Sequence, residues 1–209
     1  MQNVTTVYAG DDDPTTLTLI SALLDDESVK VETYDSAEAF LLAYSPERPG
    51  CLVLDVVMPG MDGLELQRTL GALGSDIPII FLSGTAEVST AVSALKAGAI
   101  DFIEKPFDAE RIMHCVQHAM HLDLERRYMK SRRCEMELKQ RLLTRREREV
   151  MGWMVQGKSN KEIARILGIS SRTVEVHRGR VMEKMEVRNV LQLVDRTAPL
   201  HDEPRAASA

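Results

Sequence analysis

Four sets of polar side chains stand directly after short apolar runs in the first half of the chain. They are Asp11-Asp12-Asp13, Asp55, Ser83 and Lys105. If the runs are parallel strands of one sheet, their carboxyl ends lie at the edge where open α/β sheets bind ligands. Carboxylates gathered there repel one another unless a cation neutralises them, and hard oxygen ligands with room for water suit Mg²⁺.

One of these carboxylates can also serve as a nucleophile that accepts a phosphoryl group, as in aspartyl-phosphate chemistry. Ser83 and Lys105 would then contact the phosphoryl oxygens, by a hydrogen bond and by charge. The simpler interpretation of any single Asp is a solvated strand end. That interpretation does not account for Lys105 followed by Pro106, which predicts a cis X-Pro turn after the last strand. We therefore expect a pocket for a metal ion and a phosphoryl group.

Alternating short apolar runs and amphipathic stretches must position these side chains. Five strands are expected, at 4–9, 29–34, 51–54, 77–82 and 101–104. Helical patterns lie between them, and Ser36 and Asp108 are suited to cap two of the helices. Five strands alternating with five helices predict a doubly wound, five-stranded parallel sheet of the flavodoxin-like α/β class.

Length and charge indicate two domains. The chain has 209 residues, of which 44% are hydrophobic and 28% charged, enough for buried cores and a soluble surface. Residues 1–124 contain 6 Lys and Arg against 20 Asp and Glu, whereas residues 125–197 contain 19 against 10. A basic domain after an acidic one favours a polyanion, such as nucleic acid, as a partner of the second domain.

The composition also excludes several classes of protein. No apolar run approaches the roughly 20 residues that cross a bilayer, and the N-terminus lacks the pattern of a signal peptide. The cysteines Cys51, Cys115 and Cys134 are far apart and have no metal-binding spacing. We expect a cytoplasmic protein with no membrane partner, disulfide framework or zinc site.

A long helix is expected between the two halves, because residues 107–151 contain neither Gly nor Pro. One apolar row has seven-residue spacing, and it consists of Cys115, Leu122, Met129, Met136 and Leu143. The companion row is polar, which leaves half of a coiled-coil seam. A helix that pairs with a second copy and a single solvated helix both remain open interpretations.

The basic half is expected to be all helical, with helices at 144–156, 159–167, 170–186 and 189–197. Thr144 with Glu147 and Ser159 with Glu162 fit the capping box, in which cap hydroxyl and Glu satisfy two backbone N–H groups. Gly157 and Gly168 follow apolar periodic stretches, where left-handed residues end helices.

Residues 161–177 fit a helix-turn-helix, in which the second helix enters the major groove of DNA. We expect its inner stripe to be Val174, Val181 and Met185. The outer side carries Arg172, Glu175, Val176, Arg178 and Gly179. Arg can read guanine, Glu can accept from cytosine, and Val can touch the thymine methyl group. Phosphate contacts are expected from Lys158, Lys161 and Arg180. An ordinary helical bundle with a charged face is the simpler alternative.

Several motifs of the first half occur together. They are Asp11-Asp12, Leu54-Asp55-Val-Val-Met58-Pro59-Gly60-Met-Asp-Gly63, Leu82-Ser83-Gly84, Lys96-Ala-Gly98-Ala and Asp101-Phe-Ile-Glu-Lys105-Pro-Phe107. In combination, residues 1 to about 122 resemble a response-regulator receiver domain. The resemblance implies that Asp55 is the phospho-acceptor and that Ser83 and Lys105 bind the phosphoryl group. It also implies Mg²⁺ ligands from Asp11, Asp12, Asp55 and the Val57 carbonyl, and a switch formed by Ser83 and Phe102. Gly10 departs from the family, which usually has an apolar residue there, and we expect it to loosen the end of the first strand.

The second half also carries a set of motifs. They are Leu143-Thr-Arg-Arg-Glu-Arg-Glu-Val150, Gly157, Asn160-Lys161-Glu-Ile-Ala164, Leu167-Gly-Ile169, Thr173-Val174-Glu-Val-His177 and Met182-Glu-Lys-Met185. Together they resemble the four-helix LuxR-type DNA-binding domain. Thr173 joins the residues expected to contact DNA, whereas His177 is expected to be a half-buried positioning residue and Trp153 a core residue. The whole chain is similar to the FixJ branch of the NarL/FixJ response regulators.

The resemblance implies a two-component response regulator that binds DNA, controls transcription and is phosphorylated on Asp55 by a sensor histidine kinase. Expected partners are an inverted-repeat DNA site, the kinase, RNA polymerase and, on phosphorylation, a second copy of the chain. No enzyme activity is expected beyond phospho-acceptor chemistry and slow autodephosphorylation. The expected divisions are a receiver domain at 1–122, a helical linker at 123–142, a DNA-binding domain at 143–197 and a tail at 198–209.

Two other functions compete with this one. A phosphatase of the haloacid-dehalogenase type also combines a nucleophilic Asp with Lys and Mg²⁺, but its general acid would be an Asp two residues after the nucleophile. Val57 occupies that position. The other alternative is a binding protein that is independent of phosphorylation and uses its first domain only as a dimer surface. The complete set of pocket residues, Asp11, Asp12, Asp55, Ser83 and Lys105, argues against it.

Overall fold

The computed structural model describes residues 5–24, 29–84 and 88–197. The chain divides into two compact units, Met1–Arg127 and Tyr128–Ala209. Each unit has its own hydrophobic core, so each is described separately.

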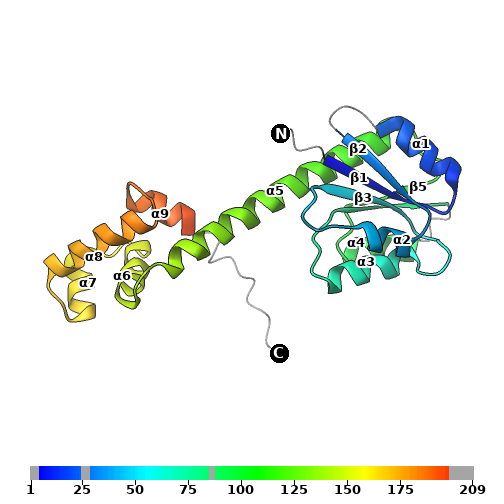
Figure 1. Cartoon of the computed structure of the whole chain (residues 1–209). Coiled ribbons are helices and arrows are strands. Elements are labelled where there is room, and N and C mark those ends of the chain that lie inside the picture. The colour runs from blue at the N-terminus through cyan, green and yellow to red at the C-terminus, as the bar shows by residue number, and fades with distance from the viewer. Residues whose placement is uncertain (1–4, 25–28, 85–87, 198–209) are drawn as a thin grey trace. The chain divides into compact units, whose positions relative to one another are not determined.

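The first unit is built on a five-stranded parallel sheet (Figure 1). Its strands, in the order β2-β1-β3-β4-β5, are β1 (Thr5–Gly10), β2 (Val29–Tyr34), β3 (Gly50–Asp55), β4 (Ile79–Ser83) and β5 (Asp101–Glu104). Its helices are α1 (Pro14–Leu24), α2 (Ala37–Ala43), α3 (Gly63–Ala72), α4 (Val88–Lys96) and α5 (Ala109–Arg141). The predicted doubly wound fold is therefore confirmed. The central strands β1, β3 and β4 are buried along their whole length, as expected for a sheet covered on both faces.

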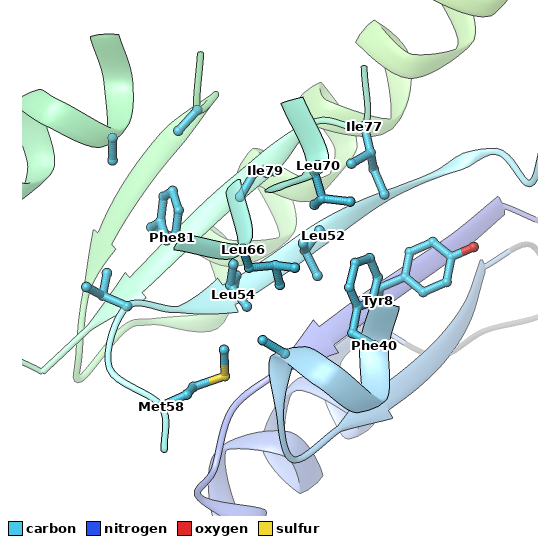
Figure 2. Close-up of a cluster of buried hydrophobic side chains, with 14 residues drawn as sticks. Tyr8, Phe40, Leu52, Leu54, Met58, Leu66, Leu70, Ile77, Ile79 and Phe81 are labelled. Atoms are coloured by element: carbon cyan, nitrogen blue, oxygen red, sulfur yellow. The ribbon is translucent and has the colours of Figure 1, made fainter. Parts of the chain in front are cut away.

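Two hydrophobic clusters cover the two faces of this sheet. One cluster packs α2, α3 and α4 against the sheet. Figure 2 shows Leu66 and Leu70 beside Leu54 and Leu52 of β3, and Phe40 beside Tyr8 of β1. The other cluster packs α1 and α5 against the opposite face. Because successive strand residues point to opposite faces, β3 contributes to both clusters.

Gly10 is the last residue of β1 and is paired on both sides. It stays in register with Tyr34 of β2 and Leu54 of β3. A Cβ atom at this position would lie only 2.9 Å from Cδ1 of Leu54. The glycine thus permits close packing of β1 on the Leu54 side chain.

Of the two helix caps expected in the first unit, one is formed by a side chain and the other is not. Asp108 caps α5 as expected, because its carboxylate accepts from the Arg111 backbone at 2.6 Å. Ser36 holds the N-cap position of α2, but its hydroxyl donates to the Asp35 carboxylate instead. The interpretation of Ser36 as a side-chain cap was therefore wrong.

Helix α5 is attached to the start of β3 by a buried carboxylate that the sequence analysis missed. Asp123 is 3% exposed and accepts from the Gly50 backbone at 2.9 Å and from the Arg127 Nε at 2.6 Å. Arg127 also donates to the carbonyl oxygens of Pro46 and Arg48, at 2.9 and 2.7 Å. These bonds make residues 123–127 part of the first compact unit.

The seven-residue apolar row of α5 is largely used inside the chain. Cys115 lies in the core of the first unit, and Met136 and Leu143 lie in the core of the second. Met129 is 48% exposed. The row therefore does not present a continuous apolar seam to a second copy of the helix.

The second unit is all helical, as predicted. After the C-terminal part of α5 it contains α6 (Arg145–Val155), α7 (Asn160–Leu167), α8 (Ser171–Lys184) and α9 (Val190–Thr197). Both expected capping boxes are present, at the starts of α6 and α7. Gly157 and Gly168 have φ values of 76° and 65°, which confirms their left-handed conformations.

A buried ion pair holds α6 to α8. Glu147 is 1% exposed and accepts from Nζ of Lys184 at 2.7 Å and from the Thr144 backbone at 2.8 Å. Lys184 also donates to the Leu142 carbonyl at 3.1 Å. The hydrogen bond from Lys184 is the main reason that the pKa of Glu147 falls from 4.5 to about 2.

We expect Glu147→Gln to destabilise the second unit at neutral pH by at most about 3 kcal/mol. A carboxyl whose pKa is lowered by folding contributes stability above its ordinary pKa and loses it as the pH falls toward about 2. The variant should therefore show a flatter loss of stability below pH 4.5. Denaturant unfolding followed by the fluorescence of Trp153, the single tryptophan, measures this. Glu149→Gln, which removes a more exposed carboxylate, is the control. An unchanged pH profile in Glu147→Gln would contradict the assignment.

Candidate functional site

Three carboxylates converge at the carboxyl ends of β1 and β3. Asp11 and Asp12 follow β1 directly and Asp55 is the last residue of β3. Because these strands are neighbours in register, one oxygen of each carboxylate lies within 4.8 Å of the others. Asp11 and Asp55 are buried and Asp12 is exposed. The structure thus gathers the set expected from the sequence.

Asp13 does not belong to this cluster. Its carboxylate accepts from the Thr15 backbone at 2.9 Å and from the Thr16 hydroxyl at 3.1 Å, in the first turn of α1. The backbone hydrogen bond from Thr15 lowers the pKa of Asp13. Asp13 therefore starts a helix, and the pocket contains two of the three consecutive aspartates.

Lys105 bridges two of the carboxylates from the end of β5. Its Nζ lies 2.6 Å from Oδ2 of Asp11 and 3.0 Å from Oδ1 of Asp55. The Lys105–Pro106 peptide bond is cis, as predicted. The Lys105 backbone also donates to the Ser83 carbonyl at 2.7 Å, which ties this turn to β4.

The charges in this pocket are out of balance. Burial raises the pKa of Asp55 above its ordinary value, and the hydrogen bond from Lys105 only partly opposes this effect. The neighbouring Asp11 and Asp12 carboxylates raise it further. Burial lowers the pKa of Lys105, but its hydrogen bonds to Asp11 and Asp55 outweigh burial and leave it raised. One ammonium group therefore serves three carboxylates, and the site favours an added cation.

The other expected pocket residues lie around this cluster. Ser83 is the last residue of β4 and is buried. Val57 follows Asp55 by two residues, and its side chain is 68% exposed. Phe102, on β5, is partly buried, and its ring centroid lies 6.4 Å from that of Phe81.

A second candidate site is the outer surface of α8 in the second unit. Val174, Val181 and Met185 are fully buried, which confirms the predicted inner stripe. The exposed surface of α8 includes Arg172, Thr173, Glu175, Val176, Gly179 and Arg180. Arg178 is half-buried and, four residues after Val174, lies beside the inner stripe. The helix can therefore present these side chains without disturbing its core.

The basic side chains of the second unit fall into two groups. Those of α5 and α6 are mostly paired with carboxylates, as Arg132 is with Asp195 and Arg146 with Glu149. Within the described chain, Lys161, Arg172, Arg178 and Arg180 of the prediction make no ion pair, and neither do Arg165 and Arg188. Lys130, Arg141, Arg148 and Arg196 are also without an ion pair among the described residues. Unpaired cations on α7, α8 and the following turn are available for phosphate groups.

Three other residues that were expected to contact DNA differ in the contacts that they make within the unit. Lys158 lies 3.5 Å from Glu162, so its charge is shared within the unit. The Thr173 hydroxyl lies 2.8 Å from that of Ser170, the N-cap of α8. Glu175 is exposed and, among the described residues, makes no ion pair with Arg172 or Arg178. Sequence reasoning did not single out Arg165 and Arg188. Only the structure shows that, among the described residues, they have no ion-pair partner.

Two family models match the chain, and together they cover both units. Residues 7–117 match the response regulator receiver domain, and residues 141–197 match bacterial regulatory proteins of the LuxR family. The chain belongs to the response regulator family. The carboxylate pocket lies in the receiver domain of this response regulator, and the unpaired cations lie in its LuxR-family domain.

Curated relatives and solved structures resemble this chain over 90% or more of its length. Response regulator protein TmoT of Ectopseudomonas mendocina is 41% identical over 94% of this chain and 89% of that protein. Transcriptional regulatory protein FixJ of Azorhizobium caulinodans is 41% identical over 90% of this chain and 89% of that protein. The structure of the response regulator StyR aligns with a TM-score of 0.81 at 39% identity, covering 93% of this chain and 98% of that one. Full-length FixJ from B. japonicum aligns with a TM-score of 0.57 at 37% identity, covering 93% and 96%.

Among the described residues of this response regulator, no helix is both long and apolar enough to span a membrane.

We expect Asp55→Asn to stabilise the metal-free receiver domain at pH 7. A carboxyl whose pKa is raised by folding opposes folding when it is ionised, so removing its charge relieves that cost. The difference should narrow as the pH falls toward 3.8, the ordinary pKa of the group. Urea unfolding followed by tyrosine near-ultraviolet circular dichroism measures it. Asp12→Asn, at the exposed carboxylate, should have a smaller effect, and a destabilised Asp55→Asn protein would contradict the argument.

Proposed function

We propose that Asp55 accepts a phosphoryl group from a sensor histidine kinase and that this modification controls DNA binding by the second domain. The observation that carries the proposal is the placement of Lys105 between Asp11 and Asp55 in a cluster of three carboxylates. The lysine gives the pocket a cation that can bind phosphoryl oxygens as well as carboxylates. Relatives named as transcriptional regulators support the same function.

The residues present fit a Mg²⁺ ion. Three carboxylate oxygens lie within 4.8 Å of one another and share one ammonium group, so a divalent cation would neutralise the remaining charge. Asp11, Asp12, Asp55 and the Val57 carbonyl would hold it. When bound, it would neutralise the charge that develops on the transferred phosphoryl oxygens.

The transfer itself needs one carboxylate oxygen and a phosphodonor. An oxygen of Asp55 attacks phosphorus, a P–O bond forms, and the P–N bond to the donor imidazole breaks and leaves its electron pair on nitrogen. Lys105 and Ser83 bind the oxygens of the transferred group. Attack of water on the acyl phosphate would release phosphate and restore Asp55, which is the slow autodephosphorylation that we propose.

A change at Ser83 can reach the surface through Phe102. When Ser83 turns to the phosphoryl group, Phe102 turns inward and alters the face of α4 and β5. Apolar side chains on α4 are already exposed there, with Val88 77%, Val92 43% and Leu95 45% exposed. This face would pair two copies of the chain, and sedimentation velocity of the phosphorylated protein measures the association.

The second domain would bind an inverted repeat, with one α8 helix in the major groove of each half-site. Arg172, Thr173, Glu175, Val176 and Arg178 would face the bases. Lys158, Lys161 and Arg180 would bind phosphates. The protein would then act on transcription in the cytoplasm, in contact with RNA polymerase.

The test of phosphorylation uses the full chain with Mg²⁺ and a small phosphodonor such as acetyl phosphate. We expect one phosphoryl group that hydroxylamine removes, because acyl phosphates react with this nucleophile, and we expect EDTA to prevent labelling. Intact-mass spectrometry measures both. Asp55→Asn should not be labelled, whereas Asp76→Asn, at an exposed aspartate, should be. Equal labelling of Asp55→Asn would exclude Asp55 as the acceptor.

The DNA test separates phosphate contacts from base contacts. Arg180→Ala should weaken binding to all sites similarly and reduce the slope of log affinity against log salt by about one. Arg178→Ala should relax the preference at particular base pairs, at a cost of about 1–3 kcal/mol. Binding-site selection and salt titrations measure these effects.

Arg145→Ala is the matched control, because this exposed arginine of α6 pairs with Glu149. It should change neither the selected sequence nor the salt slope. If Arg178→Ala kept the wild-type motif and changed only the salt slope, the base-reading role of α8 would be wrong.

A further inference from the structure

The loop between β3 and α3, residues 56–62, carries the backbone next to Asp55. Two backbone hydrogen bonds of 3.0 Å hold its ends, from the Val56 backbone to the Leu82 carbonyl and from the Gly63 backbone to the Val56 carbonyl. The Met58 side chain is buried in the core between them, as Figure 2 shows. The middle of the loop faces solvent, since Val57 is 68% exposed and Pro59 and Gly60 are exposed.

A side chain from a different element holds the far part of this loop. Oε1 of Glu38, in the first turn of α2, accepts a hydrogen bond of 3.2 Å from the Met61 backbone. Gly60 makes this approach feasible, because it has a φ of 79° and a Cβ there would lie 2.9 Å from the same oxygen. Besides the buried Met58 side chain, three hydrogen bonds therefore attach the loop, and the third depends on one carboxylate oxygen.

We propose that Glu38 is a positioning residue for metal binding: by holding Met61 it fixes the loop that presents the Val57 carbonyl to the cation. This inference rests on the proposed Mg²⁺ pocket. A backbone carbonyl cannot be aimed by side-chain rotation, so its position follows the conformation of the loop. Groups that hold a metal ligand in place without touching the metal commonly contribute to the affinity for that metal.

Glu38 could instead act through its negative charge, and the chain allows the two effects to be separated. Gln at this position keeps an Oε1 acceptor for the Met61 N–H but removes the charge. Ala removes both. Glu38→Ala and Glu38→Gln therefore differ in the hydrogen bond and not in net charge, and an exposed carboxylate acts only weakly at a distance in salt.

The experiment measures Mg²⁺ binding to the full, unphosphorylated chain by isothermal titration calorimetry at constant ionic strength. We expect Glu38→Ala to weaken the affinity by about three- to tenfold, the effect of one lost hydrogen bond on a ligand loop. Glu38→Gln should stay within about twofold of wild type. Glu47→Ala, which removes an exposed carboxylate from the α2–β3 connection, is the control for charge and should also stay within that range.

A second measurement needs no metal. Hydrogen exchange of the Met61 amide, followed by NMR in metal-free protein, should be faster in Glu38→Ala than in wild type and nearly unchanged in Glu38→Gln. This readout reports the attachment itself.

Each outcome has one meaning. Equal Mg²⁺ affinity in all four proteins would overturn the positioning role. Equal weakening in Glu38→Ala and Glu38→Gln, with Glu47→Ala unaffected, would assign the effect to charge and would also overturn it. Failure of the wild-type chain to bind Mg²⁺ would overturn the proposed metal pocket. In that case, unchanged Met61 exchange in Glu38→Ala would show that Glu38 does not hold the loop either.

Discussion

The excess of carboxylates over cations at the ends of β1 and β3 is the constraint on which the receiver domain depends. The parallel register of these two central strands brings Asp11 and Asp55 together, and both strands are buried along their length, so neither carboxylate can move away. Lys105 satisfies part of the charge from β5. The negative charge that Lys105 does not neutralise favours the binding of a further cation. The sheet fixes the positions of Asp11 and Asp55, so this excess charge persists until a ligand binds.

The domain contains another buried carboxylate, and the comparison shows what distinguishes the pocket. Asp123 is as buried as Asp55, but its hydrogen bonds come from a backbone amide and from an arginine that also binds two carbonyls. That network is complete within the fold and makes a structural attachment at the start of β3. At the other end of the same strand, Asp55 shares one lysine with Asp11. A buried carboxylate is thus structural when its hydrogen-bond donors serve no other carboxylate, as at Asp123. It is suited to react when it shares a donor, as Asp55 shares Lys105 with Asp11.

The sequence predicted those features that arise from local patterns. The five strands, the capping boxes, the left-handed glycines and the inner stripe of α8 depend on residues a few positions apart, and the structure confirms them. The bounds of three strands differ from the prediction by one or two residues. The roles of Asp123, Arg127 and Glu38 could not be predicted, because, apart from the Asp123–Arg127 pair itself, their partners lie tens of residues away and no periodicity marks them. The apolar row along α5 left open whether this helix pairs with a second copy or is solvated alone. The structure places the two ends of the row in two different cores, so one seven-residue spacing serves the packing of two separate units.

Charge counting alone pointed to the DNA-binding domain, but it did not distinguish the basic residues from one another. Helices α5 and α6 carry many of them, and their carboxylate neighbours already neutralise most of that charge at the surface. Helix α8 carries fewer, but without partners among the described residues its guanidinium groups keep their full field. Glu175 stands among these groups without pairing, which costs the unit an available ion pair. In the proposed complex, the free Glu175 carboxylate would be repelled by DNA phosphates and would weaken non-specific binding. Sites at which a base donates a hydrogen bond to Glu175 would then be favoured, so this side chain would lower affinity and raise discrimination between sequences.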